Sequence, residues 1–380
     1  MPRMIGVLAL FVAAVLLLLF LPLGAKGLAL PAPTAQPPAT SAQAMALYEP
    51  ESGTFLAEKN ADERRPMAST TKIMTALVVL ETLPLDGVIS VPPEAVGTEG
   101  SSIYLYMGEK VTIRTLLYAL MLSSANDAAA ALAVAAGGSI EGFAAMMNAK
   151  AAALGLADTH FCNPHGLHDA EHYTTARDLA RLAGAALANE TFAGIVSTRR
   201  YTAPQEGTGA TRLFLNHNRL LRTYRGAIGV KTGYTKAAGR CLVGAAEREG
   251  LTLIAVTLSD PNDWRDHAAL FDWGFSEYAG FIAAPAPVSL PVIGGTAGEV
   301  TLIPNGSLRL TLPADHAKIT ETVEAPRFLF GGFEAGEVKG KVVYRMDGVK
   351  IGEVPLVTET GIAKEPPLGF FARLKQHFQK

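Results

Sequence analysis

Apolar residues recur at two different periods along the chain, and each period predicts its own kind of element. Ala44–Tyr48 and Thr54–Ala57 are short apolar runs on either side of Glu51-Ser52-Gly53, which predicts two strands joined by a turn. After Pro66 the apolar positions recur every three to four residues through 73–80, which is typical of a buried helix. The start of that helix falls near Ser69.

The helical period dominates the middle of the chain. From Ile113 to about Asn189, Ala, Leu and Met recur at helical spacing between polar and glycine turns. Strand character then returns in three runs, and one further helix closes the region; these segments are Ile228–Thr232, Arg240–Ala246, Leu251–Leu258 and Ala268–Phe275. We therefore expect an α+β domain over 42–278, with an antiparallel sheet packed against a cluster of helices.

Beyond about Ala279 the pattern changes to short Val-rich alternating runs separated by Gly and Pro. This texture predicts a small all-β domain over 279–362. It contains few side chains suited to catalysis, so we interpret it as a spacer or a binding module. A stretch rich in Pro, Ala and Thr precedes the α+β domain and predicts a linker over 30–41.

Both ends of the chain carry patterns typical of membrane contact. Ile5–Leu23 is apolar without an ionisable residue, which predicts a signal peptide within 1–29 or an uncleaved anchor. Either one places the rest of the chain outside the cytoplasm. In the last segment, 363–380, apolar residues share one helical face and basic residues lie elsewhere, as in a helix on a membrane surface. A short unstructured tail is the alternative.

Composition excludes several classes of function. The 380 residues have a formal net charge of -2, so no broad basic field supports a nucleic-acid partner. Cys162 and Cys241 are the only cysteines, too few for a disulfide scaffold or a cysteine-based metal site. Whether they pair stays open, and we favour two buried free thiols.

We expect no cofactor and no metal. Four histidines cluster in sequence, but their spacing runs through a Pro-Gly turn and does not repeat a helix-borne ligand pair; they are His160, His165, His168 and His172. The chain also lacks a glycine-rich phosphate loop and a dinucleotide fingerprint.

Three short motifs carry the candidate chemistry. A serine hydroxyl needs a base at hydrogen-bond distance, and Lys72 lies one helical turn after Ser69. Ser124-Ala125-Asn126 follows an apolar helix and predicts a loop that presents a second hydroxyl and an amide. Lys231-Thr232-Gly233 ends a predicted strand and supplies a second lysine beside a glycine. Each motif alone also fits a capping serine, a helix-capping turn or a hairpin end, whereas all three in this order indicate a serine acyltransferase.

Through these three motifs the chain resembles penicillin-binding proteins and serine β-lactamases, whose signature is Ser-x-x-Lys, Ser-x-Asn and Lys-Thr-Gly. It is more narrowly similar to the low-molecular-weight D-alanyl-D-alanine carboxypeptidases, because three further stretches match that family: Phe161–Leu167, Thr175–Ala180 and Trp273–Phe275. The resemblance covers most of the chain after about Ala42. It implies a penicillin-binding/serine β-lactamase-like domain followed by the β-rich domain.

The resemblance also implies a reaction. Ser69 would attack the carbonyl of the penultimate D-alanine of a peptidoglycan stem peptide, with Lys72 as general base. Ser124 would relay a proton to the leaving amine, and Asn126 would bind the substrate backbone or orient Lys72. β-Lactam antibiotics would be covalent inhibitors.

In the same resemblance, Lys231 and Thr232 bind the terminal carboxylate and Gly233 lets the substrate approach. The oxyanion hole would be the backbone N–H groups of Ser69 and Tyr234. Members of the family often have histidine where Tyr234 stands, so this tyrosine is a departure.

Alternatives to an exported wall carboxypeptidase stay open at this point. A β-lactamase would need a glutamate that positions a deacylating water, and the sequence identifies none. A non-catalytic wall-binding or sporulation scaffold would be marked by the loss of Ser69 or Lys72, and both are present. The expected location is the outer face of the bacterial cytoplasmic membrane or the cell wall.

Overall fold

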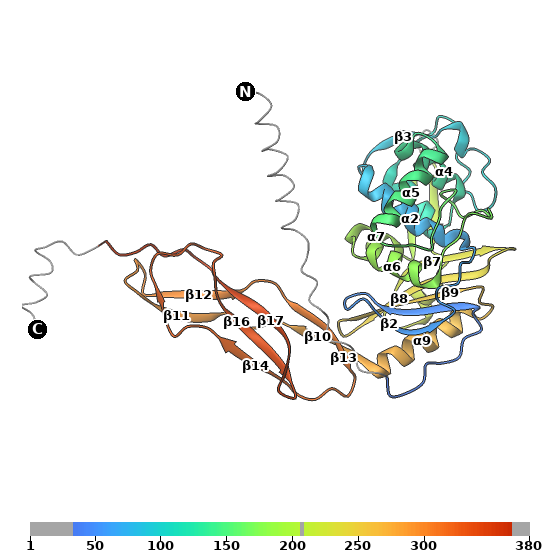
Figure 1. Cartoon of the computed structure of the whole chain (residues 1–380). Helices are drawn as coiled ribbons and strands as arrows, with labels where there is room; N and C mark the ends of the chain where they lie inside the picture. Colours follow the sequence, from blue (N-terminus) through green and yellow to red (C-terminus); the bar gives the residue numbers. More distant parts are fainter. Residues whose placement is uncertain (1–32, 206–208, 367–380) are drawn as a thin grey trace, which may run out of the picture. The chain divides into compact units, whose positions relative to one another are not determined.

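The computed structural model describes residues 33–205 and 209–366 (Figure 1). The catalytic region is built on one antiparallel sheet of five strands in the order β2-β1-β9-β8-β7. Its strands are β1 (Ala44–Glu49), β2 (Thr54–Lys59), β7 (Ala227–Thr235), β8 (Gly239–Arg248) and β9 (Leu251–Leu258). The opening hairpin and the three later runs thus form a single sheet, as the periodicity predicts, and β7 lies at one edge.

Helices cover both faces of this sheet. The helical cluster comprises the 3-10 turn η1 (Ala68–Thr71), α2 (Lys72–Thr82), α3 (Ile113–Leu122), α4 (Asn126–Gly137), α5 (Ile140–Ala153), α6 (Ala176–Leu187) and α7 (Glu190–Ser197). Within it α6 packs on β1 and β9, and α9 (Asp263–Glu277) packs on β8 and β9 from the other side, as Figure 1 shows. Alanine-rich α4 is buried from Asn126 to Ala133, because its small side chains let neighbours approach on every side.

The sequence patterns do not predict several short elements. They are β3 (Val88–Ser90) with β4 (Lys110–Thr112), β5 (Arg200–Pro204) with β6 (Thr211–Leu215), η2 (Pro93–Ala95) and α8 (Leu220–Thr223). The strands among them have three to five residues and alternate mostly between exposed and half-buried positions, so they leave little apolar signal.

The region after α9 is all β, as expected. Its strands are β10 (Tyr278–Ala283), β11 (Val288–Ile293), β12 (Glu299–Pro304), β13 (Leu308–Pro313), β14 (Ile319–Glu324), β15 (Leu329–Phe330), β16 (Val338–Met346) and β17 (Val349–Thr358). Six of them form one sheet in the order β14-β16-β17-β12-β11-β15, and β10 pairs with β13. The α+β domain followed by a small all-β part is therefore confirmed, whereas the domain limits at 42, 278 and 362 stay predictions.

The residues just before β1 are tied to α9, although they lie in the predicted linker. Thr34 donates from its backbone N–H and its hydroxyl to Glu277, and Ser41 donates from its backbone N–H to Asp266. The predicted signal segment within 1–29 lies outside the described residues, as does the predicted tail after Pro366. Within the described ranges no single helix is long and apolar enough to cross a bilayer; α4 and α5 pass only as a pair, which is bent by 81°.

Candidate active site

Ser69 lies in η1, directly before α2, so the helix begins one turn later than Ser69 itself. The turn is held from the helical half of the domain. Thr71 donates to the carbonyl of Ala68, whose φ is +48°, and the ring of His172 lies 2.8 Å from the Thr71 hydroxyl. Gly166 packs so closely that a Cβ there would come within 2.0 Å of the Ala68 oxygen. The backbone that carries the nucleophile is thus fixed by its neighbours.

Lys72 is fully buried at the base of this turn. Its Nζ lies 3.0 Å from Ser69 Oγ, 2.7 Å from Asn126 Oδ1 and 2.6 Å from the carbonyl oxygen of His165. The Asn163–Gly166 turn therefore contributes a backbone oxygen to the site. Two of the three neighbours of Nζ are acceptors only, which limits how the lysine protons can be arranged.

The pKa of Lys72 is lowered well below its usual range, first by burial and then by the charge of Lys231, against a smaller opposing effect of Asp127. A neutral amine has two N–H groups and one lone pair. The two N–H groups satisfy Asn126 Oδ1 and the His165 carbonyl, so the lone pair is left for the Ser69 hydroxyl. This arrangement fits a general base for Ser69.

The turn between α3 and α4 brings Ser124 and Asn126 to the site. Ser124 has a φ of +59° and is 6% exposed. The Asn126 side-chain N–H donates to the carbonyl of Glu99, which fixes the amide orientation and aims Oδ1 at Lys72. Of the two roles implied for Asn126, the geometry therefore favours orienting Lys72.

Strand β7 forms the opposite side of the site. Lys231 is 1% exposed, donates to the carbonyl of Thr232 at 2.8 Å, and has its pKa lowered to about 7 by burial. A Cβ at Gly233 would lie 3.0 Å from the backbone nitrogen of Ser69 and 3.1 Å from that of Thr70. Glycine is thus what lets the strand pass the nucleophile's N–H. Tyr234 follows and is 67% exposed.

Five of the eight predicted residues line one pocket of about 330 Å³. Its lining includes Ser69, Ser124, Thr232, Gly233 and Tyr234. The other three predicted residues, Lys72, Asn126 and Lys231, are buried. Hydrogen bonds join Lys72 to Ser69 and to Asn126.

Other residues of the pocket carry no sequence signal, because they come from segments far apart. They are Ser101, His217, Arg240, Cys241, Asp263 and Trp264. The Arg240 guanidinium donates to both oxygens of Asp263 at 2.8 and 2.9 Å, and its Cζ lies 5.8 Å from the Trp264 ring centre. This wall is thus a neutral ion pair beside an indole ring.

Two of the four clustered histidines are buried or half-buried parts of the scaffold. Burial lowers the pKa of His165 to about 3 and that of His172 to about 4, so both are neutral near pH 7. In residues 33–205 and 209–366 no group of three His, Cys, Asp or Glu side chains is placed to hold a metal ion. Both cysteines are free thiols, as favoured above, although only Cys241 is fully buried.

Comparison with known proteins gives consistent matches. The profile of the family described as D-alanyl-D-alanine carboxypeptidase, Peptidase_S11, matches residues 32–262. A D-alanyl-D-alanine carboxypeptidase of Streptomyces sp. (strain K15) is 41% identical over 59% of this chain and 84% of its own. DacF of Bacillus subtilis, another such carboxypeptidase, is 30% identical over 89% of each chain. The crystal structure of DacD from Francisella tularensis matches with a TM-score of 0.62 and 29% identity, over 90% of this chain and 99% of that one.

Proposed function

Since the chain belongs to the D-alanyl-D-alanine carboxypeptidase family of serine hydrolases, we propose that it removes the terminal D-alanine of peptidoglycan stem peptides through an acyl-enzyme on Ser69. The observation that carries the proposal is the buried Lys72 amine 3.0 Å from the Ser69 hydroxyl. A lysine with a lowered pKa in that position can take the hydroxyl proton at neutral pH.

During acylation one proton passes from Ser69 to Lys72 and then, through Ser124, to the leaving amine. Lys72 accepts the proton of Ser69 while Oγ attacks the carbonyl carbon of the penultimate D-alanine. The oxyanion of the tetrahedral intermediate accepts hydrogen bonds from the backbone N–H groups of Ser69 and Tyr234. As the peptide C–N bond breaks, Ser124 passes a proton to the leaving amine and recovers one from Lys72. D-Alanine leaves, and water hydrolyses the ester to restore Ser69.

The terminal carboxylate of the substrate is held at β7. Protonated Lys231 attracts it, and the Thr232 hydroxyl donates a hydrogen bond. Because the pKa of Lys231 is lowered to about 7 by burial, an arriving carboxylate also stabilises the charged form of this lysine. β-Lactams present a similar carboxylate and a strained amide, so they acylate Ser69 in the same way.

The alternatives receive less support. A scaffold that had lost catalysis would not need the Ser69–Lys72 contact. A β-lactamase needs a carboxylate free to orient the deacylating water. The acidic side chain among the described residues that line the pocket is Asp263, and it is engaged by Arg240.

The family acts on the bacterial cell wall. For this chain we propose export through the apolar segment 5–23 and attachment to the outer face of the cytoplasmic membrane through the tail after Pro366. The support for both lies in the sequence pattern.

Two variants test the acyl-enzyme. Ser69→Ala should abolish covalent labelling by penicillin, measured by mass spectrometry of the intact protein and its peptides; an adduct on another residue would contradict the proposal. Lys72→Arg keeps the positive charge but cannot supply a neutral base, so acylation should slow by about a hundredfold or more. Normal acylation in this variant would point to a different base.

A further inference from the structure

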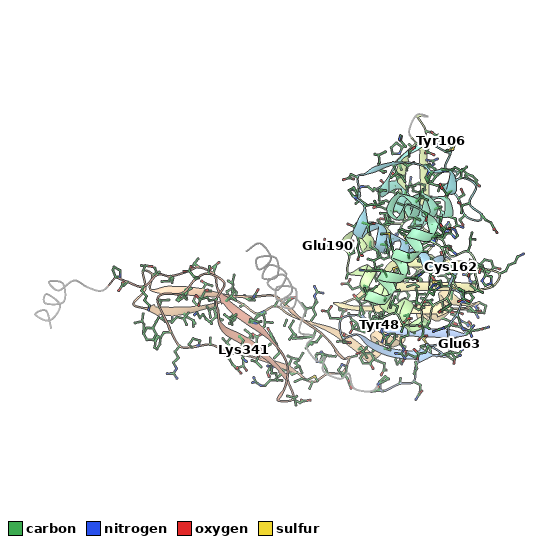
Figure 2. The ribbon with its side chains drawn as sticks, turned by 45° about the horizontal axis from the view of Figure 1, so that its top comes forward. Tyr48, Glu63, Tyr106, Cys162, Glu190 and Lys341 are labelled. Carbon is green, nitrogen blue, oxygen red and sulfur yellow. The ribbon has the colours of Figure 1, made fainter. Side chains whose placement is uncertain are left out.

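A loop beside the catalytic pocket presents aromatic side chains to solvent. The 101–109 loop (Ser101–Glu109) starts at the pocket, since Ser101 is part of its lining. Tyr104 is 86% exposed, Met107 68% and Tyr106 46%. Figure 2 labels Tyr106 on the surface of the helical part of the catalytic region. These side chains contribute little to the core.

The backbone of the loop is anchored at both ends by buried carboxylates. Asp127 is 1% exposed and accepts hydrogen bonds from the Ser102 hydroxyl at 2.6 Å and from the Leu105 N–H at 3.1 Å. Glu109 is 2% exposed, is paired with Arg212, and accepts from the Tyr106 N–H at 3.4 Å. The exposed rings are therefore presented from a fixed backbone.

Tyr104 occupies a backbone conformation that does not suit it. Its φ is +59°, where glycine or asparagine fits and a bulky residue is strained. The backbone N–H of Tyr104 donates a hydrogen bond to the Ser102 hydroxyl at 2.9 Å. Strained residues that persist in a well-anchored loop are concentrated at ligand sites. An exposed ring held this way, three residues along the chain from Ser101 in the pocket lining, is available to contact a ligand that extends out of the pocket.

The position of the ring limits what that ligand is. Tyr104 is three residues after Ser101, so its Cα lies at most about 11 Å from the Cα of that pocket residue. In peptidoglycan the stem peptide is attached to a sugar, and three residues separate the acylated D-alanine from that sugar, about 10 Å of extended peptide. The flat C–H face of a sugar packs on an aromatic ring, and tyrosine keeps its hydroxyl in water.

We propose that Tyr104 and Tyr106 form a binding site for the glycan that carries the stem peptide. The inference rests on the proposed function, and it makes the preferred substrate a glycan-linked peptide rather than a free one. The loop contacts the sugar while the peptide reaches Ser69, so binding energy from a remote part of the substrate is available for acylation.

The experiment compares two substrates in the full chain: a free pentapeptide ending in D-Ala-D-Ala, and the same pentapeptide on its N-acetylglucosaminyl-N-acetylmuramyl disaccharide. Release of D-alanine gives kcat/KM for each. The parent protein should favour the glycan-linked substrate, and Tyr104→Asn, which suits the positive φ, should lower that kcat/KM by about fivefold to tenfold with no change for the free peptide. Tyr104→Phe should keep the preference.

Phe330→Ala is the matched control, because Phe330 is an aromatic residue 69% exposed in the all-β part. It should change neither value. Equal kcat/KM for both substrates in the parent protein, or equal losses on both in Tyr104→Asn, would overturn the glycan site while leaving the carboxypeptidase function standing. A shift from dimer to monomer in Tyr104→Asn, seen by sedimentation, would overturn it in favour of a second copy of the chain. Failure to release D-alanine from either substrate would overturn both proposals.

Discussion

Gly233→Ala tests the oxyanion hole without touching any side chain of the site. The added Cβ would lie 3.0 Å from the Ser69 nitrogen and 3.2 Å from Ala68 Cβ. An oxyanion bound by the Ser69 N–H would sit about 2.7–3.1 Å from the same nitrogen. The added methyl group therefore lies as close to the Ser69 nitrogen as the oxyanion must. We expect it to displace the oxyanion from the Ser69 N–H, which is one of the two donors of the oxyanion hole.

Loss of one oxyanion donor typically costs about a hundredfold to a thousandfold in rate, or about 3–4 kcal/mol. We expect a loss of this size in the second-order rate of acylation by a fluorescent penicillin. The fold should survive, because Gly233 is not among the residues with positive φ and alanine suits a strand there. Overpacking against the Ser69 turn should lower the free energy of unfolding by about 1–3 kcal/mol.

Gly194→Ala in α7 is the matched control, since a Cβ there meets nothing within 4 Å. It should leave acylation unchanged and stabilise the helix by up to about 1 kcal/mol. Acylation of Gly233→Ala at the parent rate, with unfolding showing an intact protein, would refute the placement of the oxyanion beside the Ser69 N–H.

Three further predictions follow from buried charges and the tail. The kcat/KM for D-alanine release should fall as pH rises past about 7, where Lys231 loses its proton, and also at acid pH once Lys72 is protonated; a flat profile would contradict both roles. Because the pKa of His172 is about 4 when folded and 6.5 when unfolded, the unfolded chain binds more protons between these values. Acidification through that window should therefore remove about 3 kcal/mol of unfolding free energy through His172 alone, with further losses from His165 and His267, and His172→Gln should reduce the slope of this part of the stability profile in urea titrations. Truncation after Pro366, with the signal segment removed, should abolish flotation with liposomes but keep penicillin labelling, and equal flotation of both forms would place the membrane contact elsewhere.

The sequence could predict those parts of the fold that bury a regular pattern. Strand β9 is almost wholly buried and helix α2 is buried from Lys72 to Val79, so their apolar residues stand out. The β5–β6 hairpin escaped because only one residue in each strand, Ala203 and Phe214, is buried. The pairing of these strands with each other and their contact with α3 are tertiary features that the local pattern does not show.

In the active site, the sequence predicted the residues that belong to short motifs. Ser69 and Lys72 lie three apart, so their contact follows from local geometry. The His165 carbonyl that helps hold Lys72 was not predictable, because a backbone oxygen has no residue-type signature. Arg240 and Asp263 were missed for another reason: they come from different elements, and only the tertiary fold pairs them.

The edge position of β7 has a consequence for how much of the stem peptide can vary. In the described part of the chain β7 pairs with β8 alone, so its outer backbone groups have no strand beside them. A peptide that runs along such an edge is held through its main chain, and main-chain hydrogen bonds are the same whatever side chains the peptide carries. Bacteria that differ in the residues of their stem peptides could therefore be served by the same edge. Selection among stem peptides would then depend on the residues that bind the terminal D-alanine and on those that contact the opposite end of the peptide.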